Sequence, residues 1–235
     1  KENYDYLMSM IADTAQYLND EIAAGKTVLL EGANAALLDI DHGTYPFVTS
    51  SNPTVGGAFT GTGMNPSYLD ENIGIVKAYM TRVGKGPFPT ELHDDLGDQI
   101  REAGGEYGST TGRPRRCGWF DVPITKYSIM LNGFTSVNLT KLDVLDHLAE
   151  IKIAKAYTLD GKPFKGLPAR LEDLARIKVE YETVPGWKES LNDVTSWEEL
   201  PENAQKYVLR LEELIGCKIK YIGVGMRRDQ LIIRA

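Results

Sequence analysis

The sequence predicts an α/β protein, in which helices and strands alternate along the chain. Apolar residues recur at helical spacing over residues 5–23, and Gly25 follows them as a helix-ending glycine. A short apolar run over residues 27–30 then has the length and composition of a buried strand. Near the other end, residues 201–216 begin with Pro and end with Gly, which is the usual asymmetry of a helix.

The remaining elements follow the same pattern. Helices are predicted over residues 5–23, 91–103, 124–131, 144–148 and 201–216. Strands are predicted over residues 27–30, 75–83, 136–139, 151–157, 178–183, 218–222 and 231–233. Residues 31–66 and 108–118 are rich in Gly, Ser, Thr and Pro and are predicted as loops, and residues 161–163 as a hairpin turn. No repeat or linker divides the chain, so we expect one domain over residues 1–235.

Composition narrows the class of protein. The formal net charge is -7, which argues against a general nucleic-acid binder because that role needs a basic field. No run of about 18 apolar residues suggests a membrane span, and the first ten residues do not form a signal peptide. The chain also lacks an initiator Met, which suggests a piece of a longer protein. Two cysteines, a hundred residues apart, fit reduced thiols in a cytoplasmic protein.

The motif Thr140-Lys141-Leu142-Asp143 directly follows an apolar strand and has the form of a guanine-reading motif. A carboxylate at Asp143 can accept hydrogen bonds from guanine N1–H and N2–H, a pair of donors that adenine lacks. The stem of Lys141 can lie along the base, and ligands of open α/β sheets bind at the carboxyl ends of strands. Because four-residue motifs are common, a solvated strand end is the better interpretation of this motif taken alone.

The segment 109–116 places two kinds of hydroxyl, a glycine and three arginines within eight residues, Ser-Thr-Thr-Gly-Arg-Pro-Arg-Arg. Guanidinium groups bind carboxylates and phosphates in a bidentate manner, and Pro114 stiffens the loop. The alternative is a solvated basic loop. A concentration of positive charge in an acidic protein favours an anion site.

Other motifs are weaker. Asp39, Asp41 and His42 include metal-ligating residue types, but hydrogen bonds that hold a long loop in shape are the preferred interpretation. Glycines at 56, 57, 61 and 63 lack the GKS/T ending of a phosphate loop and fit a mobile glycine loop better. Residues 223–225, Gly-Val-Gly, permit close approach of a ligand to the backbone, although a plain tight turn explains them equally well.

Longer strings carry a family resemblance over nearly the whole chain. They are EGANAALLDIDHGTYPFVTSSN (31–52), KAYMTRVGKGPFPTEL (77–92), GSTTGRPRRCGWFD (108–121), LTKLDVLD (139–146), YETVPGW (181–187) and YIGVG (221–225). In these strings and their order, the chain resembles the C-terminal part of the adenylosuccinate synthetase family, and the EGANA form resembles its eukaryotic branch. The family joins IMP to L-aspartate with GTP through a 6-phosphoryl-IMP intermediate, in AMP biosynthesis.

The resemblance implies a fold and a set of site residues. The fold is a large mixed central sheet flanked by helices, incomplete because the N-terminal phosphate-loop half is absent. The residues implied for IMP are Asn34, Thr49, Val83 and Arg113. Those implied for aspartate are Ser109, Thr110, Thr111, Gly112, Arg113 and Arg115. Those implied for GTP are Arg115, Lys141, Leu142, Asp143, Gly223, Val224 and Gly225.

The resemblance also implies what this chain does not supply. The catalytic base and acid, and the ligands of one Mg²⁺, belong to the family's N-terminal half, so we expect no catalytic or metal-ligating residue here, and His42 is not the acid. We expect a cytoplasmic homodimer, with no nucleic-acid or membrane partner. One competing hypothesis is a nucleotide-binding fragment that is inactive without the other half. A GTPase-like switch is the other, but its GxxxxGKS/T loop does not occur in the sequence.

Overall fold

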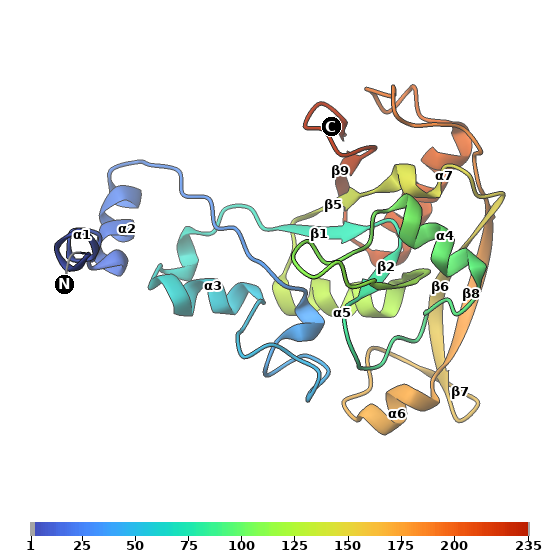
Figure 1. Ribbon diagram of the computed structural model, residues 1–235, viewed down its shortest axis with the longest axis horizontal. Helices are drawn as coiled ribbons and strands as arrows, with labels where there is room; N and C mark the ends of the chain where they lie inside the picture. The colour runs from blue at the N-terminus through green and yellow to red at the C-terminus, as the bar shows by residue number, and fades with distance from the viewer. Residues whose placement is uncertain (1–2, 235) are drawn as a thin grey trace. The chain divides into compact units, whose positions relative to one another are not determined.

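The structure, a computed structural model, describes residues 3–234 and divides the chain into two compact units (Figure 1). The first unit extends to Asp70, and the second begins at Glu71. Among residues 3–234, no helix combines the length and apolar character that a membrane span needs.

The first unit consists of short helices joined by extended loops. Its elements are α1 (Tyr4–Met8), α2 (Thr14–Ala23), η1 (Ala36–Leu38), α3 (Val55–Thr62) and η2 (Pro66–Tyr68). The prediction of a single helix over residues 5–23 is therefore wrong, because residues 9–13 separate α1 from α2. Asp13 begins α2 because its carboxylate accepts a hydrogen bond from the backbone N–H of Gln16 at 3.0 Å. Gly25, at φ 82°, follows the end of α2 as predicted.

Two further predictions in this unit are wrong. Residues 27–30 form no strand, and Leu29 is 89% exposed, since an apolar run without a pairing partner gains nothing from being extended. The glycine-rich segment predicted as a mobile loop is mostly α3. A Cβ on Gly57 would lie 1.8 Å from the carbonyl oxygen of Asn52, so close packing of the helix on the chain before it requires glycine there.

The strands of the second unit lie in three sheets among the described residues. The first sheet has the order β1-β5-β9-β10, with its first three strands parallel and the last antiparallel. Its strands are β1 (Ile73–Lys77), β5 (Ser136–Thr140), β9 (Ile219–Gly223) and β10 (Leu231–Ile233). The second sheet is the antiparallel pair β2 (Met80–Arg82) and β3 (Arg116–Gly118).

The third sheet is built around β6, which is flanked by β8 in the long twisted pair visible in Figure 1. Its strands are β4 (Phe120–Asp121), β6 (Glu150–Leu159), β7 (Lys162–Phe164) and β8 (Lys178–Pro185). The α/β class is therefore confirmed. By themselves, however, these residues form three separate sheets and not one large sheet. The predicted strand over residues 75–83 divides into β1 and β2 because the two halves pair with different strands, β5 and β3.

The helices of the second unit begin and end at capping residues. They are α4 (Asp95–Ala103), α5 (Val122–Asn132), η3 (Leu142–Leu145), α6 (Leu171–Arg176) and α7 (Glu202–Ile215). The prediction for α7 is confirmed at both ends, with Pro201 before it and Gly216 at φ 69° after it. Asp94 starts α4 later than predicted, accepting from the backbone N–H of Gly97 at 3.3 Å. No helix was predicted over the residues of α6.

A buried core holds the second unit together. Tyr207 of α7 is buried against Trp187, with ring centroids 6.0 Å apart, and its hydroxyl donates to the carbonyl of Ala78 at 2.6 Å. Burying a large side chain stabilises a fold by about 1.5–3 kcal/mol. These contacts fix the backbone directly after β1, where the candidate site begins. Cys117 and Cys217 are both buried free thiols, as predicted.

Candidate functional site

Three of the candidate segments lie at the carboxyl ends of the neighbouring parallel strands β1, β5 and β9. Lys77 at the end of β1 pairs in register with Thr140 at the end of β5, and Leu139 pairs with Ile222 one residue before the end of β9. Lys141 and Gly223 therefore lie at the same edge of the sheet. Open α/β sheets bind their ligands at this edge.

The predicted guanine motif turns sharply at this edge. Lys141 adopts a left-handed backbone, φ 60°, and η3 begins directly after it. Leu142 is fully buried, so its side chain packs in the core and only its backbone is available to a ligand. One carboxylate oxygen of Asp143, Oδ1, is buried and has no hydrogen-bond partner among residues 3–234. Burial raises the pKa of Asp143, and an acceptor without a donor is costly to keep buried.

The Gly223-Val224-Gly225 segment lies beside this turn. A Cβ on Gly223 would come within 3.4 Å of the Cα of Thr140, so the two strand ends lie close together. A Cβ on Gly225 would come 2.2 Å from the side chain of Gln230. The buried Gln230 accepts from the backbone N–H of Arg227 and donates to the carbonyl of Asn192, which fixes the turn between β9 and β10. Glycine is thus needed for packing at position 225, beside the fixed side chain of Gln230, whereas at Gly223 a Cβ would make an ordinary van der Waals contact.

A buried carboxylate, Glu106, connects this edge to the arginine-rich loop. Its side chain is 0% exposed. Oε1 accepts hydrogen bonds from Lys77 Nζ at 2.7 Å, Tyr79 Oη at 2.6 Å and Lys141 Nζ at 3.0 Å. Oε2 accepts from Arg115 Nη1 at 2.8 Å. One carboxylate therefore orients four groups from three separate segments of the chain.

The electrostatics of this cluster keep Glu106 ionised. Burial alone raises the pKa of Glu106, but hydrogen bonds from Lys77, Tyr79 and Lys141 lower it to about 2. Burial lowers the pKa of Lys77, although Glu106 acts in the opposite direction. Burial and the Glu106 charge raise the pKa of Tyr79, so its hydroxyl remains a donor. Glu106, Lys77 and Tyr79 were not predicted as site residues, and the predicted strand over residues 75–83 placed Lys77 inside a strand.

The arginine-rich loop is anchored at its base and exposed at its tip. The backbone N–H of Arg115 donates to the carbonyl of Glu106 at 2.9 Å, and that of Gly108 donates to Arg113 at 2.9 Å. The predicted aspartate-binding residues at the tip are all exposed: Ser109, Thr110, Thr111, Gly112 and Arg113. Gly112 adopts φ 63°, which favours glycine at the turn. The tip is thus free to meet a ligand, while the base is held at the sheet edge.

The three arginines of this segment have different surroundings. Nε of Arg115 is buried and has no partner in the described part of the chain, so this guanidinium keeps donors for an anion. Arg116 is bound at three nitrogens, by the carboxylate of Glu91 and by the carbonyls of Gly84 and Gly86. Its inclusion in the anion-binding set is therefore wrong, because its donors are satisfied within the fold.

The residues predicted for IMP are divided between the two units. Asn34, exposed and at φ 61°, and Thr49, whose N–H donates to Leu38 at 2.8 Å, lie in the first unit. Val83 and Arg113 lie in the second unit, and both are exposed.

The loop that carries Asn34 and Thr49 is held by one buried carboxylate, as predicted for this segment. Asp39 is fully buried and accepts from the backbone N–H groups of Asp41 at 2.9 Å and His42 at 3.1 Å. It also accepts from the hydroxyl of Thr54 at 3.0 Å. Burial opposes ionisation, but these hydrogen bonds lower the pKa of Asp39 below its ordinary value. The loop-holding interpretation of Asp39 is confirmed.

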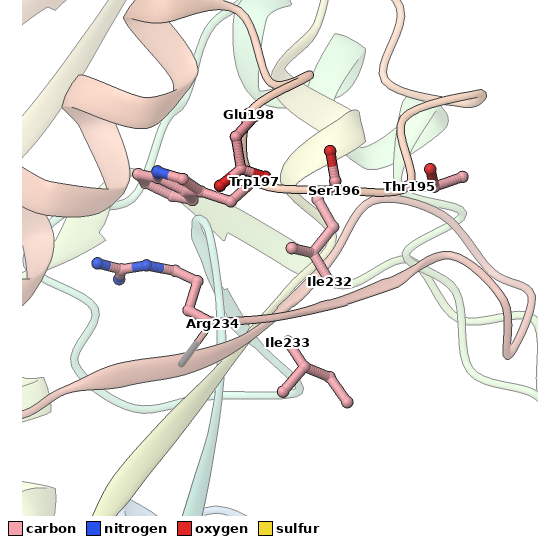
Figure 2. Close-up of a pocket in the computed structure, with 7 residues that line it drawn as sticks. All are labelled: Thr195, Ser196, Trp197, Glu198, Ile232, Ile233 and Arg234. Atoms are coloured by element: carbon pink, nitrogen blue, oxygen red, sulfur yellow. The ribbon is translucent and has the colours of Figure 1, made fainter.

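A hollow of about 370 Å³ lies elsewhere in the second unit, between residues 195–198 and 232–234 (Figure 2). Figure 2 shows Arg234 and Trp197 lining it, and the guanidinium carbon lies 4.3 Å from the indole centroid. Arg234 is bound by Glu212 and by the carbonyl of Ile219 at the start of β9. The hollow is therefore at the opposite end of β9 from Gly223 and contains none of the predicted site residues.

Residues 3–234 contain no group of three or more His, Cys, Asp or Glu side chains that could hold a metal ion. The fold is that of an open α/β protein, and the candidate residues lie at the carboxyl ends of the parallel strands of the first sheet. Proteins of this class bind their ligands at that edge.

Comparison with known proteins gives the family. The family model for adenylosuccinate synthetase matches residues 1–232, and the chain belongs to this family. The adenylosuccinate synthetase of Phytophthora infestans is 56% identical over 230 residues, 98% of this chain and 42% of the relative. That of the bacterium Trichlorobacter lovleyi is 53% identical over 229 residues, 97% of this chain and 53% of the relative. The chain thus spans about half the length of these relatives.

A solved structure agrees with the family and the fold. The structure of fully ligated adenylosuccinate synthetase from Plasmodium falciparum matches with a TM-score of 0.96 and 45% sequence identity. The match covers 99% of this chain and 56% of that chain.

Proposed function

We propose that this chain contributes to the GTP-dependent ligation of IMP and L-aspartate to adenylosuccinate, a step of AMP biosynthesis. In the first step, the γ-phosphoryl group of GTP is transferred to O6 of IMP, and the bond from that phosphorus to the β-phosphate oxygen breaks. In the second, the amine of aspartate attacks C6, the carbon–oxygen bond breaks and phosphate leaves. The chain supplies the guanine, aspartate and part of the IMP site.

The observation that carries this proposal is the buried carboxylate oxygen of Asp143 without a partner. It lies at the carboxyl edge of the sheet, two residues after Lys141. The N1–H and N2–H groups of guanine supply the donors that this carboxylate lacks, whereas adenine offers no such pair. The stem of Lys141 packs along the base, and the backbone of residues 223–225 lines its other side. We therefore assign Asp143 to the choice of GTP over ATP.

The arginine-rich loop binds the anionic parts of the substrates in this proposal. Thr110, Thr111 and Arg113 at the exposed tip, with Ser109 and Gly112, bind the carboxylates of aspartate, and Arg113 also contacts IMP. Arg115 contacts aspartate and the phosphates of GTP through the donors that Glu106 leaves available. A metaphosphate-like transition state needs neutralisation of charge more than covalent help, and arginines provide it. Closure of the tip over substrate excludes water from the transferred phosphoryl group.

The rest of the site comes from Asn34, Thr49 and Val83, which we assign to IMP. We assign the catalytic base, the acid and the ligands of one Mg²⁺ to residues of the family outside this chain. When bound, Mg²⁺ neutralises phosphate charge. We also propose that those residues complete the sheet and that the protein forms a homodimer. We also propose that the protein is cytoplasmic, although two relatives, from Ostreococcus tauri and Ostreococcus lucimarinus, are named as chloroplastic.

The test is formation of adenylosuccinate from IMP, aspartate, magnesium and GTP, with ATP as the control nucleotide. We expect turnover with GTP, and not with ATP, by the full-length protein that contains this chain. A second hypothesis is that residues 1–235 by themselves bind nucleotide without turnover, because the chain spans half the length of its relatives. Recovery of turnover when the other half is added supports the ligase. Absence of turnover in every arm contradicts it.

A further inference from the structure

We propose that Glu106 is a positioning residue that couples the guanine-reading lysine to the arginine loop, so that both GTP and aspartate depend on one buried carboxylate. The inference rests on the proposed function and adds a residue to it. Glu106 contacts no substrate in this proposal. It acts through Lys141 and Arg115, which do.

The contacts of Glu106 reach both parts of the site. Its Oε1 accepts from Lys141 Nζ at 3.0 Å, and its Oε2 accepts from Arg115 Nη1 at 2.8 Å. Lys141 and Arg115 belong to different segments, the turn after β5 and the base of the arginine loop. Each oxygen of this carboxylate therefore holds the head group of one site residue in place, so both residues depend on Glu106.

The backbone around Glu106 restricts the same two residues. The backbone N–H of Arg115 donates to the carbonyl of Glu106 at 2.9 Å, and Nε of Arg101 in α4 donates to the carbonyl of Arg115 at 2.8 Å. Lys141 Nζ also donates to the carbonyl of Gly104, at the end of α4, at 2.5 Å. Because Glu106 follows α4 by three residues, the helix end, the loop base and the lysine form one connected assembly.

A role in the stability of the fold alone explains this arrangement of charges less well. Three cations, Lys77, Lys141 and Arg115, bind the carboxylate of Glu106. The carboxylate of Asp143 interacts with Lys141, which leaves a surplus of one positive charge in the cluster. Buried ion pairs contribute little net stability, and an unbalanced cluster contributes less. A surplus of positive charge beside an exposed loop tip is useful where a triphosphate or a dicarboxylate binds. The cluster thus holds the cations in place without neutralising them.

The structure supplies a matched control. Glu91 is another partly buried carboxylate in the same unit, and it binds Arg116, the residue next to Arg115. The carboxylate of Glu91 forms its hydrogen bonds and ion pairs with Arg116 and His93, and with neither Lys141 nor Arg115. Glu91→Gln therefore removes an arginine–carboxylate pair and leaves the proposed coupling in place.

The experiment uses the full-length protein, with GTP affinity measured by calorimetry and the KM for aspartate by steady-state kinetics. We expect Glu106→Gln to weaken GTP binding and to raise the KM for aspartate, each by about tenfold, as for the loss of a hydrogen bond to a charged group. Lys141→Met is expected to weaken GTP binding alone. Glu91→Gln is expected to change neither by more than about twofold. In the double variant Glu106→Gln/Lys141→Met, the losses in GTP affinity are expected to be less than additive.

The outcomes distinguish a failure of the proposed guanine site from a failure of the proposed coupling by Glu106. If Lys141→Met leaves GTP binding unchanged, the guanine site itself is wrong. If Lys141→Met weakens GTP binding but Glu106→Gln affects one substrate only, or Glu91→Gln affects both equally, the coupling role of Glu106 is overturned. Should Glu106→Gln not fold, Glu106→Gln/Lys77→Met removes one buried anion and one buried cation together. We expect this double variant to show the same weaker GTP binding and the same raised KM for aspartate. The absence of these changes overturns the inference.

Discussion

The replacement Asp143→Asn tests how this chain reads its nucleotide. The carboxylate of Asp143 offers two acceptor oxygens, one of which is buried without a partner. In the asparagine variant, one oxygen becomes an NH2 group, which faces the N2–H donors of guanine instead of accepting from them. Burial raises the pKa of Asp143, so removal of its charge is not expected to destabilise the ligand-free protein.

The magnitude follows from the hydrogen bonds that are lost. A hydrogen bond to a charged group contributes about 1.5–3 kcal/mol, and the new contact between two donors adds to the loss. We expect kcat/KM for GTP to fall by about 100-fold or more, since each 1.4 kcal/mol is a factor of about ten. Xanthosine triphosphate carries an acceptor, O2, where GTP carries its amino group. The variant should therefore use xanthosine triphosphate better than GTP, with IMP binding nearly unchanged.

The assay is formation of adenylosuccinate at limiting nucleotide, with GTP, xanthosine triphosphate and ATP compared in the full-length protein. Asp146→Asn is the matched control. Asp146 lies three residues further on and accepts from Trp187 Nε1 and the N–H of Leu191, each at 2.8 Å. We expect the control to lower stability and to keep the preference for GTP. Equal losses with GTP and xanthosine triphosphate in Asp143→Asn would refute the assignment of this carboxylate to guanine.

Three other replacements test separate parts of the protein. Arg113→Leu should raise the KM for aspartate by roughly 10- to 100-fold in steady-state kinetics, because the exposed guanidinium is assigned to a carboxylate. Asp121→Asn should remove a pH dependence, because burial raises the pKa of Asp121 to about 6 from its ordinary 3.8. Relative to the variant, the free energy of unfolding of the wild type should fall by about 3 kcal/mol as pH rises from 3 to 7, at 1.36 kcal/mol per pKa unit, and urea titrations of the two proteins measure this difference. Asp39→Ala should expose the backbone of residues 39–54 to hydrogen exchange, since three N–H groups lose their acceptor.

Controls make these results interpretable. Arg170→Leu removes another exposed arginine of the second unit, and an equal rise in the KM for aspartate would count against Arg113. Asparagine at position 121 keeps an acceptor for the N–H of Ile124, so the cap of α5 is retained while the charge is lost. The same pH slope in both proteins would contradict the assignment to Asp121. Unchanged exchange in Asp39→Ala would show that other contacts hold the loop.

Local signals in the sequence predicted part of the fold well. The helix α7 was predicted from Pro201 and Gly216 because caps and periodicity are properties of neighbouring residues. The strand predicted over residues 27–30 failed because an apolar run forms a strand only where a partner exists. The glycines of α3 were misinterpreted because the need for Gly57 comes from the carbonyl of Asn52, a packing requirement that composition does not reveal.

The candidate site, like the fold, was predicted from the sequence only in part. The residues Lys141 and Asp143 form a contiguous motif and were predicted, and whether they bind guanine stays a prediction. Glu106 was missed because its partners, Lys77, Tyr79, Lys141 and Arg115, are brought to it by the pairing of strands distant in sequence. No local pattern marks a lone glutamate of this kind.

The neighbouring residues Arg115 and Arg116 show what side-chain direction adds to composition. In sequence they are equivalent members of a basic cluster. Successive side chains of an extended segment point in opposite directions, and β3 begins at Arg116. Arg115 accordingly binds Glu106 and keeps donors available, whereas Arg116 binds Glu91 and the carbonyls of Gly84 and Gly86. A charge count therefore overestimates the number of donors that this loop can offer to an anion, and the binding of an anion by Arg113 and Arg115 stays a prediction.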